Sequence, residues 1–323
     1  MVSRISFDNN LIKAMEVFVA IAETGQVTIA AKLLGITQSA ASQHLRTLET
    51  TFGVTLLDRT VRPVKLTQAG ELFHRHTLRV LNEVEDLVTD MRHQGARPIS
   101  RLRVGMLAST ATTLTPDLVA LAKDEFKVDD MTVYAGQETD HAGLLRTKQV
   151  DLVITSNPLY DMDGLERHSI LKESFLLVLP KSYDGPTSNL EEIFKRLPLV
   201  RFASTTSIGR RTEQHLRRLK LQAPRVIQAD RSSMVTACVA RGMGCTLLTP
   251  SLLIDGFVER MPLNIRPLPI AGISRTITLL ARSKELGALP NRFAETSKRI
   301  LITQIERQMG QTGLNAVEIL SDE

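Results

Sequence analysis

The sequence predicts an α/β protein whose two halves are built differently, and three observations lead to this prediction. With 323 residues the chain is too long for one ordinary core and favours two or three domains. Residues 11–94 carry apolar residues at helical spacing, whereas residues 102–281 alternate short apolar runs with amphipathic stretches. A Gly-Ala-Arg-Pro stretch at residues 95–98 separates the two patterns. We expect the strands of the second half to be mostly parallel.

The composition is that of a globular protein without a membrane partner. Apolar residues make up 43% of the chain and charged residues 23%, and no apolar run approaches the roughly 20 residues of a membrane span. No signal-peptide pattern follows Met1, so we expect a cytoplasmic protein. The net charge of +5 permits a polyanionic partner without proving one. The basic excess is local, because residues 37–79 hold six Lys or Arg against three Asp or Glu.

Three helices are predicted near the N-terminus. The apolar residues of the first lie on one face, and they are Leu11, Met15, Phe18, Val19 and Ala22. Gly25 ends this helix, and Thr28 is the expected N-cap of a short second helix over residues 29–34. Gly35 can take the positive φ of a tight turn, and Thr37 can cap the third helix.

The third helix has an apolar stripe opposite a polar one. Ala41, Leu45 and Leu48 make the inward stripe. Ser39, Gln43 and Arg46 have the same spacing on the opposite face. Two short helices around a glycine turn, the second with an outward polar stripe, describe a helix-turn-helix, whose recognition helix fits the major groove of DNA. An ordinary helical hairpin with a solvated face is the alternative.

A β-hairpin is predicted directly after the third helix. Residues 53–57 and 64–66 are short strand-like pieces around Arg59-Thr60-Val61-Arg62-Pro63. Such a hairpin is typical of a wing with cations at its tip, which can meet phosphates or a minor groove. A solvated surface hairpin without a DNA contact is the alternative.

A long helix is predicted over residues 67–95. Two series of residues recur every seven positions, and they are Phe73, Val80 and Leu87, and Thr77, Val84 and Met91. Parallel heptad series favour packing against a partner helix. We therefore predict a dimer held by Phe73, Val80, Val84, Leu87 and Met91, which would place two recognition helices on an inverted-repeat operator.

Residues 11–93 resemble the DNA-binding module and linker helix of the LysR-type transcriptional regulators. The closest stretches are residues 30–34 (AAKLL), 37–42 (TQSAAS), 45–49 (LRTLE), 56–59 (LLDR) and 66–71 (LTQAGE). The resemblance implies contacts to double-stranded DNA, and the predicted DNA-binding residues are Thr28, Thr37, Gln38, Ser39, Ala40, Ser42, Gln43, Arg46, Arg62 and Pro63. Two departures are noted: the family often has Arg at the place of Gln43 or His44, and Phe at the place of Leu57.

In the C-terminal half, residues 102–105, 175–180 and 232–250 resemble the effector domain of this family, so that the likeness covers residues 11 to about 305. It implies a periplasmic-binding-protein-like effector domain over residues 96–309, with a winged helix-turn-helix over residues 1–66 before the linker helix. The domain would have two Rossmann-like subdomains, about 100–171 plus 269–305 and about 172–268, and residues 310–323 would form a flexible tail. The resemblance also implies a homodimer or homotetramer and contact with RNA polymerase at activated promoters.

Two hydroxyl-rich segments mark the expected effector site, a cleft at the carboxyl ends of strands. Residues 108–113 (ASTATT) and 203–207 (ASTTS) each follow a predicted strand and are expected to be loops beside helix N-termini, which suit anions. The predicted effector-binding residues are Ser109, Thr110, Asn157, Arg201, Ser204, Thr205 and Thr206. Helix-capping loops are the alternative, and aromatic acids, sugar acids and amino-acid derivatives all match an anionic effector.

Rival classes are disfavoured by missing motifs. No nucleophile elbow, dinucleotide fingerprint, phosphate-binding loop or metal-spaced His, Asp and Glu set is present, so we expect no enzyme, no metal and no cofactor. A solute-binding protein should have no DNA-binding module. A redox-responsive regulator using Cys238 and Cys245, the only cysteines, is the alternative within the same architecture.

Overall fold

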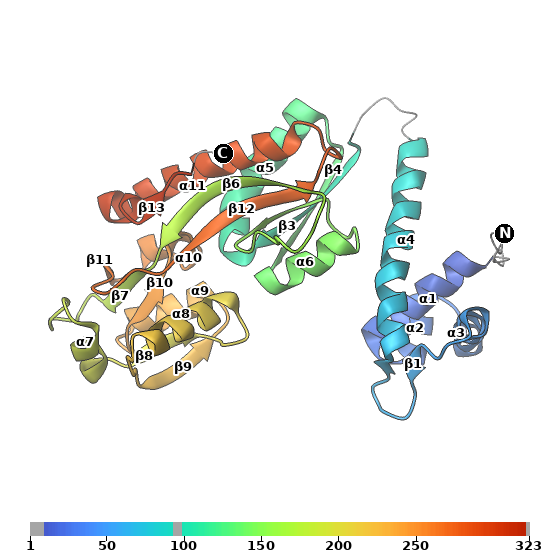
Figure 1. The fold of residues 1–323 in the computed structure, drawn as a ribbon, viewed down its shortest axis with the longest axis horizontal. Helices are drawn as coiled ribbons and strands as arrows, with labels where there is room; N and C mark the ends of the chain where they lie inside the picture. Colours follow the sequence, from blue (N-terminus) through green and yellow to red (C-terminus); the bar gives the residue numbers. More distant parts are fainter. Residues whose placement is uncertain (1–9, 93–98, 321–323) are drawn as a thin grey trace. The chain divides into compact units, whose positions relative to one another are not determined.

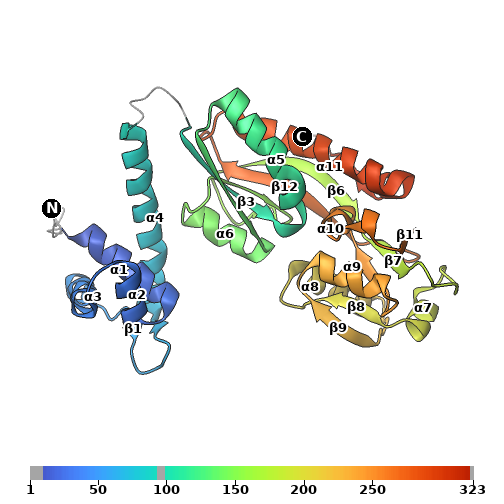
Figure 2. The same ribbon diagram turned by 180° about the vertical axis from the view of Figure 1, so that it is seen from behind.

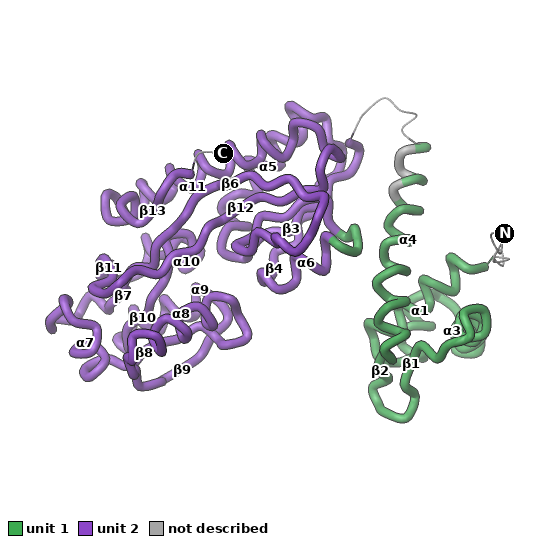
Figure 3. The backbone as a smooth tube through the Cα atoms, viewed as in Figure 1, with its two compact units in different colours: residues 1–96, 146–149 green, residues 97–145, 150–323 purple. Residues whose placement is uncertain are grey.

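A computed structural model describes residues 10–92 and 99–320. The chain divides into two compact units, residues 1–96 with 146–149 and residues 97–145 with 150–323 (Figure 3). The predicted break at residues 95–98 lies outside the described residues, as do the outermost residues of the predicted first and last domains.

The first unit contains three helices, a short hairpin and a long helix (Figure 1). The helices are α1 (Leu11–Thr24), α2 (Val27–Leu33), α3 (Gln38–Phe52) and α4 (Gln68–Arg92), and the hairpin strands are β1 (Leu57–Asp58) and β2 (Lys65–Leu66). Phe18, Leu45 and Leu48 are fully buried in a shared core, as the apolar stripes predicted. Gly25 and Gly35 have φ of 67° and 65°, which confirms both predicted turns.

One predicted cap is wrong. α2 begins at Val27 with Gln26 as its N-cap residue, and no side chain caps it. Thr28 therefore lies in the first turn of the helix, where it is exposed. The apolar Val27 packs against the module's core, and this contact extends the helix past the polar cap signal.

The second unit begins with a six-stranded sheet of order β13-β6-β12-β5-β3-β4. Its strands are β3 (Arg101–Leu107), β4 (Asp130–Gly136), β5 (Leu152–Thr155), β6 (Leu165–Ser174), β12 (Ser274–Arg282) and β13 (Val317–Glu318). α5 (Ala108–Phe126) and α11 (Leu289–Leu314) share one buried core with the sheet, and α6 (Glu138–Arg146) belongs to a separate one (Figures 1 and 2). The sheet therefore lies between two helical layers.

The second subdomain is built on a smaller set of strands, with β10-β7-β11 antiparallel and β8-β9 parallel. Its strands are β7 (Leu176–Pro180), β8 (Leu199–Phe202), β9 (Arg225–Ala229), β10 (Thr246–Leu248) and β11 (Leu263–Pro267). A bridge between Leu199 and Cys245 joins the two sets. The helical elements are α7 (Leu190–Arg196), α8 (Ser207–Arg218), α9 (Ser232–Ala240), α10 (Pro250–Asp255) and the 3-10 turn η1 (Val258–Arg260).

The prediction of mostly parallel strands is wrong. β12 runs antiparallel to both β5 and β6, and β13 runs antiparallel to β6. The reason is that β6 and β12 are the two strands that cross between the subdomains. They pass in opposite directions and pair from Ser274↔Ser174 to Arg282↔Leu165.

Two more local predictions fail in this unit. α5 begins at Ala108, so residues 108–113 are helical turns rather than a loop. The expected flexible tail is also structured as far as it is described, because α11 extends to Leu314 and β13 pairs with β6. Ala316 is buried in the core of the second subdomain and its carbonyl accepts a hydrogen bond from Ser174 N at 2.7 Å, which explains why this polar end is held. Among the described residues, no helix is long and apolar enough to cross a membrane.

Candidate functional sites: a DNA-reading module and a ligand cleft

The outward face of α3 is polar and exposed. Thr37 caps the helix, since its hydroxyl accepts a hydrogen bond from Ala40 N at 3.2 Å and thereby fixes the start of the helix. Beyond this cap the polar side chains predicted for DNA contact are exposed, and they are Gln38, Ser39, Ser42, Gln43 and Arg46. The opposite face is buried through Ala41, Leu45 and Leu48. A glutamine amide on such a face can form two hydrogen bonds with an adenine edge, and a guanidinium can do the same with guanine.

The wing is attached to the helices by backbone as well as side-chain contacts. Val64 N donates to Gly25 O at 3.0 Å, and a Cβ placed on Gly25 would lie 2.7 Å from Pro63 Cβ. Arg59 pairs with Glu49 of α3 at 2.8 Å, so this cation is occupied within the module. Arg62 at the tip of the wing is exposed. Of the two wing arginines, Arg62 is therefore the one that we expect to meet DNA.

α4 has an apolar face that the module itself leaves partly open. Leu87 is 58% exposed, Met91 67% and Val80 38%. Nearer its start, α4 bounds an open apolar groove of about 780 Å³ together with α1, and Val80 and Phe73 both line it. The ring of Phe73 packs edge-on against Phe18 at 5.2 Å between centroids, so this residue also serves the module's own core.

The second unit contains a cleft between its subdomains, with a cavity of about 440 Å³. The starts of four helices line it: α5, α6, α8 and α9. Side-chain caps at α6 and α8 are supplied by Asp140, which accepts from Gln137 N, and by Thr206, which accepts from Gly209 N. α5 and α9 have no side-chain cap, so their first backbone N–H groups can meet an anion.

Arg275 lines this cleft and belongs to a buried ion pair on the crossing strands. Arg275 of β12 donates from Nε to Glu173 Oε1 of β6 at 2.6 Å, and both side chains are buried. Arg275 Nη2 donates to Ser109 Oγ at 3.2 Å and to Ser251 Oγ at 2.7 Å. Since Ser109 opens α5 and Ser251 lies in α10, this network joins both subdomains at their hinge.

The structure brings together two of the seven residues predicted for effector binding. Ser109 and Thr206 line the cleft. Thr110 is buried and donates to Leu107 O at 3.0 Å. Asn157 lies outside the cleft lining, where its side chain accepts from Leu159 N at 3.1 Å.

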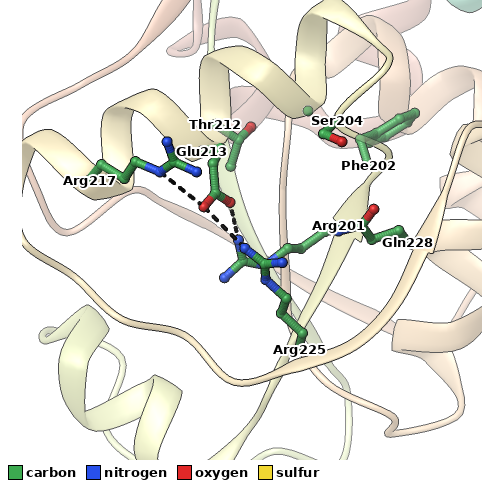
Figure 4. Close-up of a pocket in the computed structure, with 9 residues that line it drawn as sticks. Arg201, Phe202, Ser204, Thr212, Glu213, Arg217, Arg225 and Gln228 are labelled. Carbon is green, nitrogen blue, oxygen red and sulfur yellow. Dashed lines mark hydrogen bonds and ion pairs between the residues drawn. The ribbon is translucent and has the colours of Figure 1, made fainter.

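Arg201 and Ser204 line a separate, smaller pocket of about 180 Å³ (Figure 4). There Arg201 forms an ion pair with Glu213, which also accepts from Arg217 at 3.3 Å and from Arg225 at 3.4 Å. The guanidinium of Arg201 is thus held by a carboxylate of its own subdomain. Thr205 also lies outside the cleft lining, and its carbonyl accepts from Arg210 at 2.8 Å.

Sequence reasoning missed the charged residues of the cleft, which are Glu138, Asp140, Asp230, Arg231, Asp255 and Arg275. Glu138 and Asp140 follow β4, and Asp230 and Arg231 follow β9, at the edge where ligands bind in α/β sheets. Their position after two predicted strands could therefore have indicated the site. Burial raises the pKa of Asp255, and a hydrogen bond from Ser232 and the charges of Arg231 and Arg275 oppose this shift.

Both cysteines pack in the core of the second subdomain. Cys245 is fully buried, and burial raises its pKa to about 12, so its thiolate is scarce at neutral pH. Cys238 is half-buried and packs against the same core. This environment disfavours the redox-responsive alternative.

A winged helix-turn-helix linked by a long helix to a two-subdomain domain with a ligand cleft defines a class, the ligand-responsive DNA-binding regulators. The family model described as bacterial regulatory helix-turn-helix protein, lysR family, matches residues 12–71. The model described as LysR substrate binding domain matches residues 95–300. The chain therefore belongs to the LysR family, and it is a DNA-binding transcriptional regulator with an effector-binding domain rather than an enzyme.

Relatives of known name cover nearly the whole chain. The nitrogen assimilation regulatory protein nac of Klebsiella aerogenes is 26% identical over 309 residues, which are 92% of this chain and 95% of that protein. The crystal structure of CbnR, a LysR family transcriptional regulator, superposes with a TM-score of 0.64 at 17% identity and covers 90% of this chain and 99% of its own. A full-length OxyR variant from Pseudomonas aeruginosa gives a TM-score of 0.61 at 17% identity, with 90% and 94% covered. The two structures support the fold.

Proposed function

We propose that the exposed face of α3 reads an operator in the major groove while the wing meets the backbone or minor groove. The observation that carries this proposal is the set of exposed polar side chains on α3, opposite a stripe that is completely buried. Gln43 and Arg46 would contact base edges. The residues that would contact bases or phosphates are Gln38, Ser39, Ala40 and Ser42. In the wing, Arg62 and Pro63 would contact the DNA. Thr28 would contact a phosphate at the start of α2, and Thr37 would position α3 through its cap. CbnR has been crystallised in full length with its target DNA, which supports DNA binding by a protein of this fold.

The DNA-binding proposal is tested by comparing two variants on one labelled operator. Gln43→Ala should weaken operator binding by about 1–3 kcal/mol and leave binding to unrelated DNA unchanged. Arg62→Ala should weaken both and lower the slope of log affinity against log salt by about 1 if it contacts a phosphate. Fluorescence anisotropy at several salt concentrations measures both effects. Operator affinity that is unchanged in both variants would show that another surface reads the DNA.

We propose further that the chain dimerises through α4, and that dimers pair into a homotetramer on an inverted-repeat operator. Val80, Val84, Leu87 and Met91 would contact the partner helix, and Phe73 would add its edge at the groove beside α1. Leu87→Glu should raise the dimer dissociation constant at least about tenfold, because it buries unpaired carboxylates. Val88→Glu is the matched control, since Val88 is also exposed but lies off the heptad series. Sedimentation that is equal for the two variants would contradict this interface.

The effector-binding part of the proposal rests on the cleft. A small effector with a negatively charged group would bind between the subdomains, at Ser109, Thr206 and the open start of α5. Binding would change the angle between the subdomains and with it the spacing of the DNA-binding modules and the bend in the DNA. The protein would act on chromosomal DNA in the cytoplasm, and on RNA polymerase at promoters that it activates. Footprints of the full chain with and without a bound effector should differ in protected length or in DNA bending, and identical footprints would contradict this coupling.

A further inference from the structure

The cleft has more negative than positive side chains on its walls. Glu138, Asp140, Asp230 and Asp255 supply carboxylates, while Arg231 and Arg275 supply guanidinium groups. A purely anionic effector would meet this excess of like charge in a partly dry space, where Coulomb energies are larger than in water. The charges of the walls therefore favour a ligand that carries a positive group as well as a negative one.

The charges already neutralised by protein groups can be set aside. Arg275 is compensated by the buried Glu173 at 2.6 Å. Glu138 accepts from the Ser156 hydroxyl and lies 4.0 Å from Arg211. Asp140 is held at the first turn of α6, where the helix dipole favours its charge.

Asp230, Arg231 and Asp255 remain, all beside the start of α9 or the end of α10. Within residues 10–92 and 99–320, Asp230 and Arg231 form no ion pair within 4.0 Å and no hydrogen bond through their side chains. Asp255 accepts a hydrogen bond from Ser232 and feels the charges of Arg231 and Arg275, yet its pKa is still raised by burial, so a further cationic neighbour is favourable there. Asp230 is exposed at the rim of the same side. This side of the cleft consequently has one carboxylate more than it has guanidinium groups.

Groups that can bind an anion lie at the start of α8 and at the start of α5. Ser207, the first residue of α8, lines the cleft and is only 8% exposed. Its hydroxyl has no hydrogen-bond partner in the described part of the chain, and its oxygen is open to the cavity rather than sealed in the core, so it can bond to a ligand there. A ligand oxygen would satisfy it. The uncapped N–H groups of α5 face the same cavity and suit a carboxylate.

We propose that the effector carries a protonated nitrogen as well as a carboxylate, as amino acids and their derivatives do. The nitrogen would lie against Asp230 and Asp255, and the carboxylate would be bound by Ser207 and the start of α5. A cavity of about 440 Å³ is within the range of small-molecule sites. This inference rests on the proposed function, because it specifies the ligand of the same cleft.

The test uses the full chain and three matched sets of probes. The first set is the twenty protein L-amino acids, the second their deaminated carboxylic acids, and the third their decarboxylated amines. Thermal shift finds stabilisers, and calorimetric titration gives their dissociation constants. We expect at least one amino acid to bind, and its two analogues to bind at least about tenfold more weakly, since each leaves one pole of the cleft without a partner.

Variants assign the two poles. Asp255→Asn and Asp230→Asn should each weaken the amino acid at least about tenfold and leave the deaminated acid unchanged or tighter. Ser207→Ala should weaken the amino acid and the deaminated acid alike. Asp184→Asn is the control, because Asp184 is exposed and lies outside the cleft lining. Circular dichroism of each variant confirms that the domain is folded.

The outcomes separate this inference from the function on which it rests. A deaminated acid that binds as tightly as its amino acid, with no effect of Asp255→Asn, would overturn the inference and leave an anionic effector in place. Tight binding of the amine alone, lost in Asp255→Asn, would overturn the carboxylate pole. If no amino acid binds, the inference fails. If carboxylates, phosphates and phenolics also fail to bind, the proposed effector cleft fails with it.

Discussion

Replacing Gly25 by alanine tests how the wing is held to the helices. Gly25 has a φ of 67° at the end of α1, a conformation that costs an L-residue roughly 1–2 kcal/mol. A Cβ there would also lie 2.7 Å from Pro63 Cβ, so the wing must move or the core must strain, at about 1–3 kcal/mol more. We therefore expect Gly25→Ala to destabilise the module by about 2–5 kcal/mol in total.

Gly53 provides a control with the same backbone and no neighbour. It ends α3 with a φ of 66°, and a Cβ on it would meet nothing within 4 Å. Gly53→Ala should therefore cost only the conformational part, about 1–2 kcal/mol. Hydrogen exchange of the amides of α1 and α3 in the full chain measures both losses as opening free energies. Operator affinity should fall in Gly25→Ala and change little in Gly53→Ala, and equal losses of stability in the two variants would refute the reasoning about Pro63.

Three further predictions concern buried groups of the effector domain. Glu173→Gln should destabilise the domain by about 3–5 kcal/mol in urea unfolding, because it leaves the buried charge of Arg275 unpaired, and a loss below about 1 kcal/mol would contradict this. Burial lowers the pKa of His141 from 6.5, so the unfolded chain binds its proton more readily. The free energy of unfolding should therefore fall as the pH drops below about 6.5, and it should fall less in His141→Gln. Parallel pH profiles of the two proteins in calorimetry would contradict this. Because burial raises the pKa of Cys245 to about 12, iodoacetamide at neutral pH should label Cys238 first, as mass spectrometry can show, and preferential labelling of Cys245 would be the contrary result.

The DNA-binding module could be predicted almost completely from the sequence because its signals are local. Each helix has one apolar stripe, and glycines with positive φ mark two of its turns. The free outward face of α3 follows from the same periodicity. Thr28 was misplaced because a good capping residue also fits the first turn of a helix whose start is decided by packing.

The cleft could be predicted only in outline. Ser and Thr at residues 108–113 suggested a loop, since they compete with helical hydrogen bonds in short peptides. In the folded chain these residues begin α5 instead, where the Thr110 hydroxyl donates to Leu107 O at the end of β3 and the Ser109 hydroxyl accepts from Arg275. β6 is hard to recognise in the sequence because its polar and apolar residues do not alternate clearly, and its pairing depends on β12, which lies far along the chain. The charged residues of the cleft come from segments that lie far apart in the sequence and are brought together by the topology of the sheet. Patterns within a single segment therefore cannot show that these residues share one site.

The pairing of β13 with β6 has a mechanical consequence. Val317 lies in register with Glu173, so the hinge at this level is a strip of three strands with a buried ion pair across it. A third strand stiffens such a strip against twisting, and Lys172 adds an ion pair to Glu318 at 2.8 Å. The ease with which the two subdomains turn about each other is thus set partly by residues that do not line the cleft. Changes in the last segment of the chain would tune how strongly a bound effector is felt without altering which effector is recognised.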